Sequence, residues 1–226
     1  DGIGNVRTLN IDILDQSALE KYCEGVEAVY HLAYINGTKY FYSIPDKILE
    51  VGIIGTHNIL KASLKQNVSH FYLASSSEVY HHASKIPTDE NVECKIPDIE
   101  NPRYSYGGGK IACELMTINY LRETETQYVI FRPHNVYGPQ MGFEHVIPDL
   151  IFKIYNQSKI NDTKNIEIEI QGDGSDTRAF IYIKDAISAI KKCTLSNSDC
   201  GIYHIGNSEE ITITELVKKI AEVMDI

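Results

Sequence analysis

The sequence predicts an α/β fold built on a parallel sheet, of the doubly wound Rossmann type. Short β-branched runs alternate with longer amphipathic segments along the chain, which is typical of strands joined by crossover helices. The 226 residues suit one sizeable domain, or one domain with a small appendage. With 43% hydrophobic and 23% charged residues, the composition is that of a globular protein and excludes a disordered or fibrous chain.

The first part of the chain has the most regular alternation. Residues 26–33 form a nearly continuous apolar run, which predicts a strand covered on both faces. Residues 46–66 have apolar side chains at helical spacing and predict a crossover helix. The other elements expected here are strands over 5–14, 70–76 and 127–133, a helix over 17–24 with Ser17 as N-cap, and a helix over 105–123.

Beyond Pro133 longer loops replace the regular alternation. The elements expected here are a helix over 146–157, a polar insert over 158–165, and short strands over 166–170, 180–183 and 202–206, the last two each followed by a helix. We therefore expect a sheet domain over residues 1–133 and a smaller mixed lobe over 134–226, with elements that return to the sheet.

Charge, apolar runs and cysteine content limit the kinds of ligand and the cellular compartment that we expect. The 21 Lys and Arg against 31 Asp and Glu give a formal charge of −10, which argues against a nucleic-acid ligand. The apolar runs fall short of the roughly 20 residues that cross a bilayer, and the opening residues lack the features of a secretory signal. The five cysteines are widely spaced without a CxxC pair, so we expect reduced thiols in a cytoplasmic protein and no metal site.

Tyr106 and Lys110 are the first candidates for chemistry. They stand at i and i+4 at the start of the expected helix, so the ammonium can lie close to the phenol. A phenol with its usual pKa near 10 needs a shift of about 3, roughly 4 kcal/mol, to act as a base at neutral pH. A neighbouring lysine, together with a cationic cofactor ring, could supply that shift. The alternative is a surface pair that arises by chance in a chain with 15 tyrosines.

A serine cluster follows the strand expected over 70–76. The carboxyl ends of neighbouring parallel strands meet at the ligand crevice of such a sheet, so Ser76 is expected beside Tyr106. There its hydroxyl could bind the substrate hydroxyl that is being deprotonated. The alternative is a loop or N-cap serine.

With these motifs the sequence resembles the extended short-chain dehydrogenase/reductase family, specifically its nucleotide-sugar epimerase/dehydratase branch. The resemblance covers essentially the whole chain. The motifs that carry it are VYHLA (29–33), IIGTHNIL (53–60), SSSEVY (75–80), YGGGK (106–110), RPHNVYGP (132–139), GDGSDTRAFIYIKDA (172–186) and YHIGN (203–207).

The resemblance implies an NAD-dependent enzyme, without excluding NADP, whose dinucleotide-binding domain covers 1–133 and whose substrate lobe covers 134–226. It assigns Tyr106 as the base, Lys110 as partner of that base and of the nicotinamide ribose, and Ser76 as the catalytic hydroxyl. The further cofactor contacts that it implies are Asp12, Ile13, Ala33, Ser75 and Pro133. The substrate contacts that it implies are Ser76, Glu78, His134, Asn135, Val146 and Arg178.

Two of these residues also have a plain structural alternative. The planar fork of donors on Arg178 suits a diphosphate, but a solvated charge at a strand edge is the other interpretation. His134 is equally well interpreted as a core histidine with satisfied hydrogen bonds.

The chain departs from the family pattern at its start. The family opens with a glycine-rich turn at a helix N-terminus that receives the pyrophosphate, whereas GIG at 2–4 precedes a strand and opens no helix. We therefore expect roughly the first 50 to 60 residues of a family member to lie upstream of Asp1. The strand over 5–12 would then be separated from that over 26–33 by two absent strands. Residues 1–226 alone are expected to bind dinucleotide poorly, which tight NAD binding would contradict.

Smaller departures bear on the reaction. Ser77 replaces the Asp of the 4,6-dehydratases, and Gly52 stands where the family often has Asn. Gly107, Gly108 and Gly109 each cost up to about 1 kcal/mol relative to Ala, so the first turn of their helix should depend on tertiary packing.

We expect a UDP-sugar 4-epimerase that works through a 4-keto intermediate. The resemblance further implies a homodimer formed through the two long helices. The enzymatic alternatives are a UDP-glucuronate decarboxylase or a nucleotide-sugar 4,6-dehydratase. The alternative from another class is a non-catalytic binding protein with the same fold.

Overall fold

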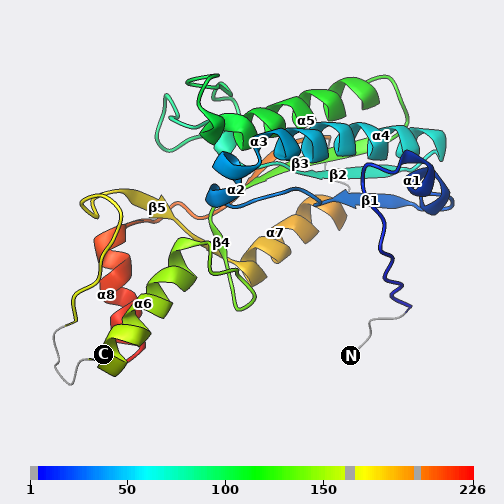
Figure 1. Ribbon diagram of the computed structural model, residues 1–226. Helices are drawn as coiled ribbons and strands as arrows, with labels where there is room; N and C mark the ends of the chain where they lie inside the picture. The colour runs from blue at the N-terminus through cyan, green and yellow to red at the C-terminus, as the bar shows by residue number, and fades with distance from the viewer. Residues whose placement is uncertain (1–4, 161–165, 196–199) are drawn as a thin grey trace.

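The computed structural model describes residues 5–160, 166–195 and 200–226 (Figure 1). Its central sheet has four parallel strands in the order β1-β2-β3-β7. These strands are β1 (Ala28–His31), β2 (His70–Ala74), β3 (Gln127–Pro133) and β7 (Gly201–Ile205). This arrangement confirms the predicted Rossmann-like α/β fold with a parallel sheet.

Helices cover both faces of the sheet, as Figure 1 shows. One face carries α3 (Pro45–Leu49), a π-helical turn (Glu50–Ile54), α4 (Gly55–Lys65) and α5 (Ser105–Leu121), and α7 (Ile183–Leu195) lies on the other. The helix predicted over 46–66 is therefore confirmed as one continuous helical stretch. Short elements precede α3 and α5: α1 (Gln16–Tyr22), α2 (Thr38–Ser43), and 3₁₀ turns at Ser77–Val79 and Pro102–Tyr104.

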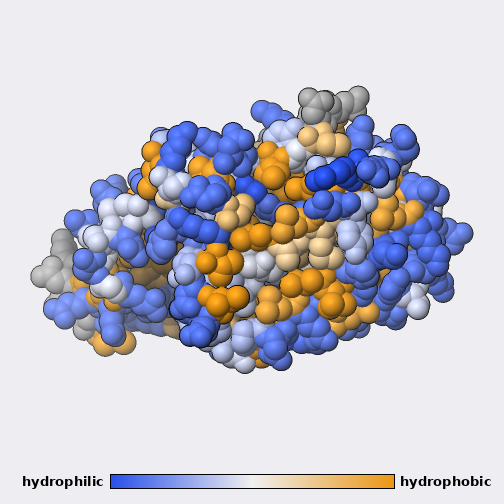
Figure 2. Space-filling view, turned by 90° about the horizontal axis from the view of Figure 1, so that it is seen from above, coloured by the Kyte–Doolittle hydropathy of each residue, from blue (hydrophilic) through white to orange (hydrophobic). Residues whose placement is uncertain are grey.

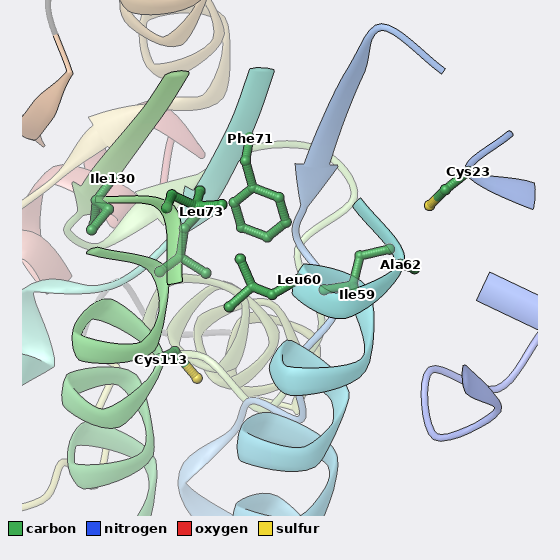
Figure 3. Packing of buried hydrophobic residues seen from close by; sticks show 9 residues of the cluster. Cys23, Ile59, Leu60, Ala62, Phe71, Leu73, Cys113 and Ile130 are labelled. Atoms are coloured by element: carbon green, nitrogen blue, oxygen red, sulfur yellow. The ribbon is translucent and has the colours of Figure 1, made fainter. Parts of the chain in front are cut away.

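The main core lies between the sheet and the α4–α5 layer. Leu60 of α4 and Cys113 of α5 share this cluster with Phe71, Leu73 and Ile130 of β2 and β3 (Figure 3). A second apolar cluster fills the opposite face, where Ala186 of α7 packs with side chains that include Val129 and Phe131 of β3. Because β2 and β3 bury both faces, the carboxyl ends of these strands are held at fixed positions.

The C-terminal part holds shorter elements and two small sheets. They are β4 (Val136–Tyr137), α6 (Val146–Ile160), β5 (Thr177–Ala179), β6 (Ile181–Tyr182), β8 (Glu210–Thr212) and α8 (Ile213–Val223). Strand β4 pairs with β6 in parallel, and β5 pairs with β8 antiparallel. Strand β7 returns to the central sheet beside β3, whereas α6 and α8 lie away from it (Figure 1). The division of the chain after Pro133 stays a prediction.

Two predicted strands are wrong. Residues 5–14 and 166–170 form no strand, because no described strand lies beside either segment to complete its backbone hydrogen bonds. The first segment leads instead into α1, whose N-cap is Asp15 rather than Ser17: the Asp15 carboxylate accepts from the backbone N–H of Ala18 at 3.0 Å. Part of the predicted polar insert, 161–165, lies outside the described residues.

The prediction that residues 26–33 are covered on both faces is also wrong. The strand is shorter, and Tyr30 and Leu32 are 46% and 61% exposed. Strand β1 is the edge of the described sheet, and α7 packs on β3 and β7 rather than over β1. The apolar pattern was therefore correct for strand formation, but one face of the strand is open.

Apolar side chains also gather on the outer face of the α4–α5 layer. Figure 2 shows this face, and the exposed apolar residues of the helices that form the layer include Ile54 of the π-helical turn and Leu115 of α5. Within the described parts of the chain, no helix is both long enough and apolar enough to cross a membrane.

Candidate active site

The structure brings Ser76, Tyr106 and Lys110 together at the carboxyl end of β2. Tyr106 lies in the first turn of α5 and is hydrogen-bonded to the Ser76 hydroxyl. Lys110, one turn further along α5, donates from Nζ to the carbonyl oxygen of Ala74 at 2.7 Å. Ser76 also caps the following 3₁₀ turn by accepting from the backbone N–H of Glu78 at 3.2 Å. The N-cap alternative for Ser76 is therefore confirmed, and its catalytic role stays a prediction.

The ionisation of Tyr106 differs from the sequence expectation. Burial raises the pKa of Tyr106 to about 12, and the hydrogen bond from Ser76 offsets only part of that effect. The nearby Glu78 carboxylate raises it further, because a second negative charge is unfavourable there. The protein groups alone therefore keep the phenol protonated, so an additional positive charge is needed to make it a base at neutral pH.

Lys110 is held as a nearly buried cation. The residue is 4% exposed, and burial lowers the pKa of its ammonium to about 8, against the charges of Cys113 and Glu114, which act to raise it. Its Nζ lies 3.9 Å from the centre of the Tyr34 ring and 5.6 Å from that of Tyr106. A lysine in this environment loses its proton more easily than an exposed one.

Two aromatic rings enclose Tyr106. The ring of Tyr34 meets it edge-on at 5.1 Å between centres, and the ring of Phe41 of α2 stacks on it, also at 5.1 Å. Phe41 in turn lies under the guanidinium of Arg103, 5.1 Å from the ring centre. The segment after β1 therefore covers the Tyr106 ring from two sides.

A charged cluster lies beside Ser76. Glu78 accepts from Arg103 Nη2 at 3.0 Å, and its carboxylate lies 3.9 Å from Nδ1 of His81. His81 adopts a positive φ of 50°, a conformation that is uncommon for any residue except glycine. The Nη1 of Arg103 and the Nε2 of His81 are buried without a hydrogen-bond partner. Strained backbone and unsatisfied donors of this kind cluster at functional sites.

A buried ionic network holds the loop that follows β2 and carries Ser75 and Ser76. Arg132 of β3 forms two hydrogen bonds to the Glu114 carboxylate, Nε to Oε1 at 2.9 Å and Nη2 to Oε2 at 2.5 Å. The Ser75 hydroxyl donates to the same carboxylate, and Arg132 also donates to the Tyr80 hydroxyl. Tyr80 is joined to Nε2 of His204 at 2.6 Å. The network therefore ties β3, α5 and β7 to the loop after β2.

The predicted cofactor contacts fall into two groups. Ala33 and Pro133 follow or end β1 and β3, so with Ser75 they border the same edge of the sheet as Lys110. The hydroxyl of Ser75 is turned to Glu114 rather than to that edge. Ile13 packs against Gly55 at the start of α4, and Asp12 is exposed and accepts from the backbone N–H of Leu14 at 2.9 Å.

The predicted substrate contacts of the C-terminal part gather around Ala179 of β5. The Nδ2 of Asn135 donates to the Ala179 carbonyl oxygen at 2.8 Å, and Nδ1 of His134 lies 3.3 Å from the same oxygen. His134 also accepts from the backbone N–H of Asn207 at 3.1 Å, so both ring nitrogens have partners, as in its structural interpretation. Val146 opens α6 and is partly exposed.

Arg178 is a solvated strand-edge charge in this structure. Its guanidinium donates to the Thr177 carbonyl oxygen at 2.7 Å and lies 3.4 Å from the Asp176 carboxylate. The side chain is about half exposed, and its partners, Thr177 and Asp176, are its own neighbours in the sequence. The structure therefore assembles the predicted catalytic residues, and the role of Arg178 as a substrate contact stays a prediction.

Three residues of the site were not predicted from the sequence: Tyr34 and Phe41, which enclose Tyr106, and Arg103, which pairs with Glu78. The only available signal for Tyr34 was the pair of unusual glycines, Gly52 and Gly109, which lie against its hydroxyl. Arg103 stands close before Tyr106 in the sequence, but nothing in its spacing indicates a contact with Glu78.

The groups at the sheet edge fit the nicotinamide end of a dinucleotide. Lys110 offers a buried cation, and Ala33 and Pro133 present small or apolar surfaces beyond β1 and at the end of β3, on either side of β2. The sequence contains no G-x-x-G-x-x-G turn of the kind that receives the pyrophosphate. The residues that the structure describes therefore suit the nicotinamide, where hydride is transferred, and not the pyrophosphate.

Known proteins are similar to this chain in sequence and in fold. It is 28% identical over 219 residues to a dTDP-D-glucose 4,6-dehydratase of Dictyostelium discoideum, covering 94% of this chain and 49% of that protein. It is 26% identical to UDP-glucuronic acid decarboxylase 4 of Arabidopsis thaliana, with 96% and 47% covered. The structure of a UDP-N-acetylglucosamine 4-epimerase from Methanobrevibacter ruminantium M1, in complex with UDP-N-acetylmuramic acid, matches with a TM-score of 0.83 at 24% identity, over 96% of this chain and 66% of that one.

The chain thus spans about half the length of the first two proteins. A family model, described as the NAD dependent epimerase/dehydratase family, matches residues 2–206. That match covers most of the chain and includes Ser76, Tyr106 and Lys110, so the chain belongs to the NAD-dependent epimerase/dehydratase family.

Proposed function

We propose that this chain carries the catalytic residues of an enzyme that oxidises a nucleotide-linked sugar at C4. The observation that carries the proposal is the assembly of Tyr106, hydrogen-bonded to Ser76, with the Lys110 ammonium one helical turn away. Membership of the family, and the reactions in the names of its similar members, support the same chemistry.

Each residue has a separate task in that step. Tyr106 accepts the proton of the C4 hydroxyl, and Ser76 donates a hydrogen bond that stabilises the developing phenolate. Lys110 supplies a positive charge close to the same ring. NAD, held by Lys110 and the strand ends at Ala33 and Pro133, would supply the hydride acceptor that makes C4 a ketone, and its cationic ring would supply the further positive charge that Tyr106 requires. General-base catalysis of this kind contributes about 10²- to 10⁴-fold.

The first candidate for the complete reaction is the predicted 4-epimerase. In that reaction the 4-keto sugar turns over in the site and is reduced on its opposite face, so the net redox change is zero. The presence of Ser77 in place of the dehydratase Asp supports a reaction without loss of water. The substrate would be a UDP-linked hexose.

The second candidate is decarboxylation of a nucleotide-linked uronic acid, which Arg103 favours. Its guanidinium pairs with Glu78 beside Ser76 and has a buried Nη1 without a partner, so it offers a donor to a substrate carboxylate. Once C4 is a ketone, the C6 carboxylate is β to it, so CO₂ leaves with its electron pair remaining at C5 as an enolate. That enolate then takes a proton, and the ketone is reduced. Several similar proteins carry names of uronic acid decarboxylases.

The shared first step is tested with Tyr106→Phe in the protein as its gene encodes it. Turnover of the sugar substrate should fall by about 10²- to 10⁴-fold. Tyr120→Phe, at the other end of α5, is the matched control and should keep most of the activity. Unchanged turnover in Tyr106→Phe would overturn the proposal, and a protein without turnover on any nucleotide sugar would favour the non-catalytic alternative.

The two candidate reactions are separated by their products. The protein is incubated with UDP-glucose and, separately, with UDP-glucuronate, and the sugars are identified by NMR. Conversion of UDP-glucose to its C4 epimer supports the epimerase, and release of CO₂ with a UDP-pentose supports the decarboxylase. Arg103→Leu should abolish only the second reaction.

A further inference from the structure

The hydroxyl of Tyr34 lies in a space that two glycines leave open. A Cβ atom at Gly109, in α5, would lie well under 3.0 Å from the Tyr34 hydroxyl oxygen, and so would a Cβ atom at Gly52, in the π-helical turn. Real Cβ atoms do not approach so closely, so both positions require glycine while Tyr34 keeps its place. Three residues distant in the sequence therefore fit one another at the site.

The Tyr34 ring, rather than its hydroxyl, makes the polar contact. The hydroxyl is buried without a hydrogen-bond partner, and burial raises the pKa of Tyr34, so the phenol stays neutral. The ring centre lies 3.9 Å from the Lys110 Nζ, well within the range of a cation–π contact. Tyr34 therefore stabilises the Lys110 ammonium through the face of its ring and not through its hydroxyl.

Lys110 has few other partners to fix it. Its Nζ donates to the Ala74 carbonyl oxygen, and among the residues that the structure describes no carboxylate lies within ion-pair distance of it. A long flexible side chain held by one hydrogen bond would sample other directions. The Tyr34 ring closes the side on which the ammonium would otherwise move.

We propose that Tyr34 is a positioning residue for Lys110, and that Gly52 and Gly109 provide the space it needs. The ring stabilises the protonated ammonium and keeps it directed at Ala74 and toward Tyr106. The inference takes from the proposed function only that Lys110 assists Tyr106. The tests below use no substrate. They can therefore contradict this inference while the proposed function stands, and a failure of the proposed function would leave them valid.

The packing is tested by glycine substitutions in two backgrounds. At Gly109, only the hydroxyl oxygen of Tyr34 lies under 3.0 Å from the added Cβ, and the next ring atom lies at 3.4 Å. Gly109→Ala should therefore lower the folded-to-unfolded ratio roughly ten- to hundredfold with Tyr34 present and much less in a Tyr34→Phe background. At Gly52, two ring carbons also lie under 3.0 Å, so Tyr34→Phe should not rescue Gly52→Ala. Urea unfolding of the protein as its gene encodes it gives these ratios.

The effect on Lys110 is tested by ¹³C NMR of its Cε, assigned by loss of the signal in Lys110→Met. Tyr34→Phe keeps the ring and should leave the titration midpoint unchanged. Tyr34→Leu removes the ring and should raise the acid dissociation constant of Lys110 about two- to fivefold, which moves its midpoint to lower pH. A residue that merely filled space would alter stability but not this midpoint.

Two results would overturn the proposal. One is an unchanged or higher Lys110 midpoint in Tyr34→Leu, measured where circular dichroism shows the variant folded. The other is an equal loss of stability from Gly109→Ala with Tyr34 and with Phe at position 34. If Tyr34→Leu does not fold, Tyr34→Met gives the same test with a residue that is flexible and still apolar.

Discussion

Arg132 and Glu114 form an ion pair with two hydrogen bonds in the interior, with side chains 4% and 6% exposed. Burial alone would lower the pKa of Arg132, but the hydrogen bonds and charge of Glu114 outweigh it and raise that pKa. Since Ser75 donates to the same carboxylate, the pair fixes the loop that carries Ser76. A buried ion pair therefore helps to fix the position of Ser76, the hydroxyl proposed to be catalytic.

We predict that Glu114→Gln is strongly destabilising. The substitution leaves the Arg132 guanidinium buried without its counter-charge, and breaking such a pair costs about 3–5 kcal/mol. Urea unfolding at pH 7 measures the loss. Glu123→Gln, at an exposed carboxylate just beyond α5, is the control and should change little. A loss below about 1 kcal/mol would show that the interior tolerates the unpaired cation.

Tyr106 should make the protein less stable at high pH. Its pKa rises from 10.0 to about 12 on folding. Its contribution is therefore complete below pH 10 and is lost as the pH rises from 10 to 12, because the unfolded chain ionises first. Between pH 9 and pH 11 the wild type should lose about 1 kcal/mol more than Tyr106→Phe.

Urea unfolding at those two pH values makes this comparison, with Tyr42→Phe, at an exposed tyrosine, as the control. Equal losses in the wild type and Tyr106→Phe would contradict a buried phenol. Tyr34→Phe should behave like Tyr106→Phe, because burial also raises the pKa of Tyr34.

The sequence predicts a feature of this structure well when the residues that determine it lie close together in the chain. The helices over 46–66 and 105–123 were predictable, because their apolar spacing is local. The contact of Ser76 with Tyr106 was also predictable, since strand ends meet at one edge of a parallel sheet. Residues 5–14 and 166–170 have equally good β-branched runs, but a strand also needs a neighbour, and that depends on the whole fold.

The site was predicted less completely than the fold, for the same reason. The role of Tyr34 depends on Gly52 and Gly109 meeting in space, and no spacing in the sequence contains that information. Arg178 was predicted by resemblance as a contact of the substrate diphosphate, and the structure shows it about half exposed on β5, so that role stays a prediction. The exposure of Tyr30 likewise follows from β1 being an edge strand, not from its own sequence.

Lys110 should reduce stability at neutral pH. The pKa of its ammonium falls from 10.5 to about 8 on folding. The cost is therefore full below pH 8 and disappears as the pH rises toward 10.5, because the folded state binds its proton less tightly than the unfolded chain. Lys110→Met removes this cost but also the hydrogen bond to Ala74, so we expect a net gain of about 1 kcal/mol at pH 7.

That gain should come with loss of sugar turnover, as is common for residues kept for activity. Urea unfolding at pH 7 and pH 10 gives the stability of both proteins, and the gain should shrink at the higher pH. Lys61→Met, at an exposed lysine of α4, is the control. A destabilised Lys110→Met at pH 7 would show that the ammonium contributes more by its contacts than burial costs.

The outer face of the α4–α5 layer should bind a second copy of this chain. The resemblance to the family implies a homodimer through the two long helices, and we propose that this face forms it. Ile54 and Leu115 are 47% and 57% exposed there, and burying them removes apolar surface from water at about 25 cal/mol per Å². Leu115→Glu places a charge at that contact and should convert the dimer to a monomer in sedimentation equilibrium. Val223→Glu, at a still more exposed apolar residue of α8, is the control and should stay dimeric. A monomeric wild type would contradict the proposed dimer, and a dimeric Leu115→Glu would place the contact elsewhere. Because α5 carries Tyr106 on its buried side, the monomeric variant should still show the Lys110 midpoint of the wild type.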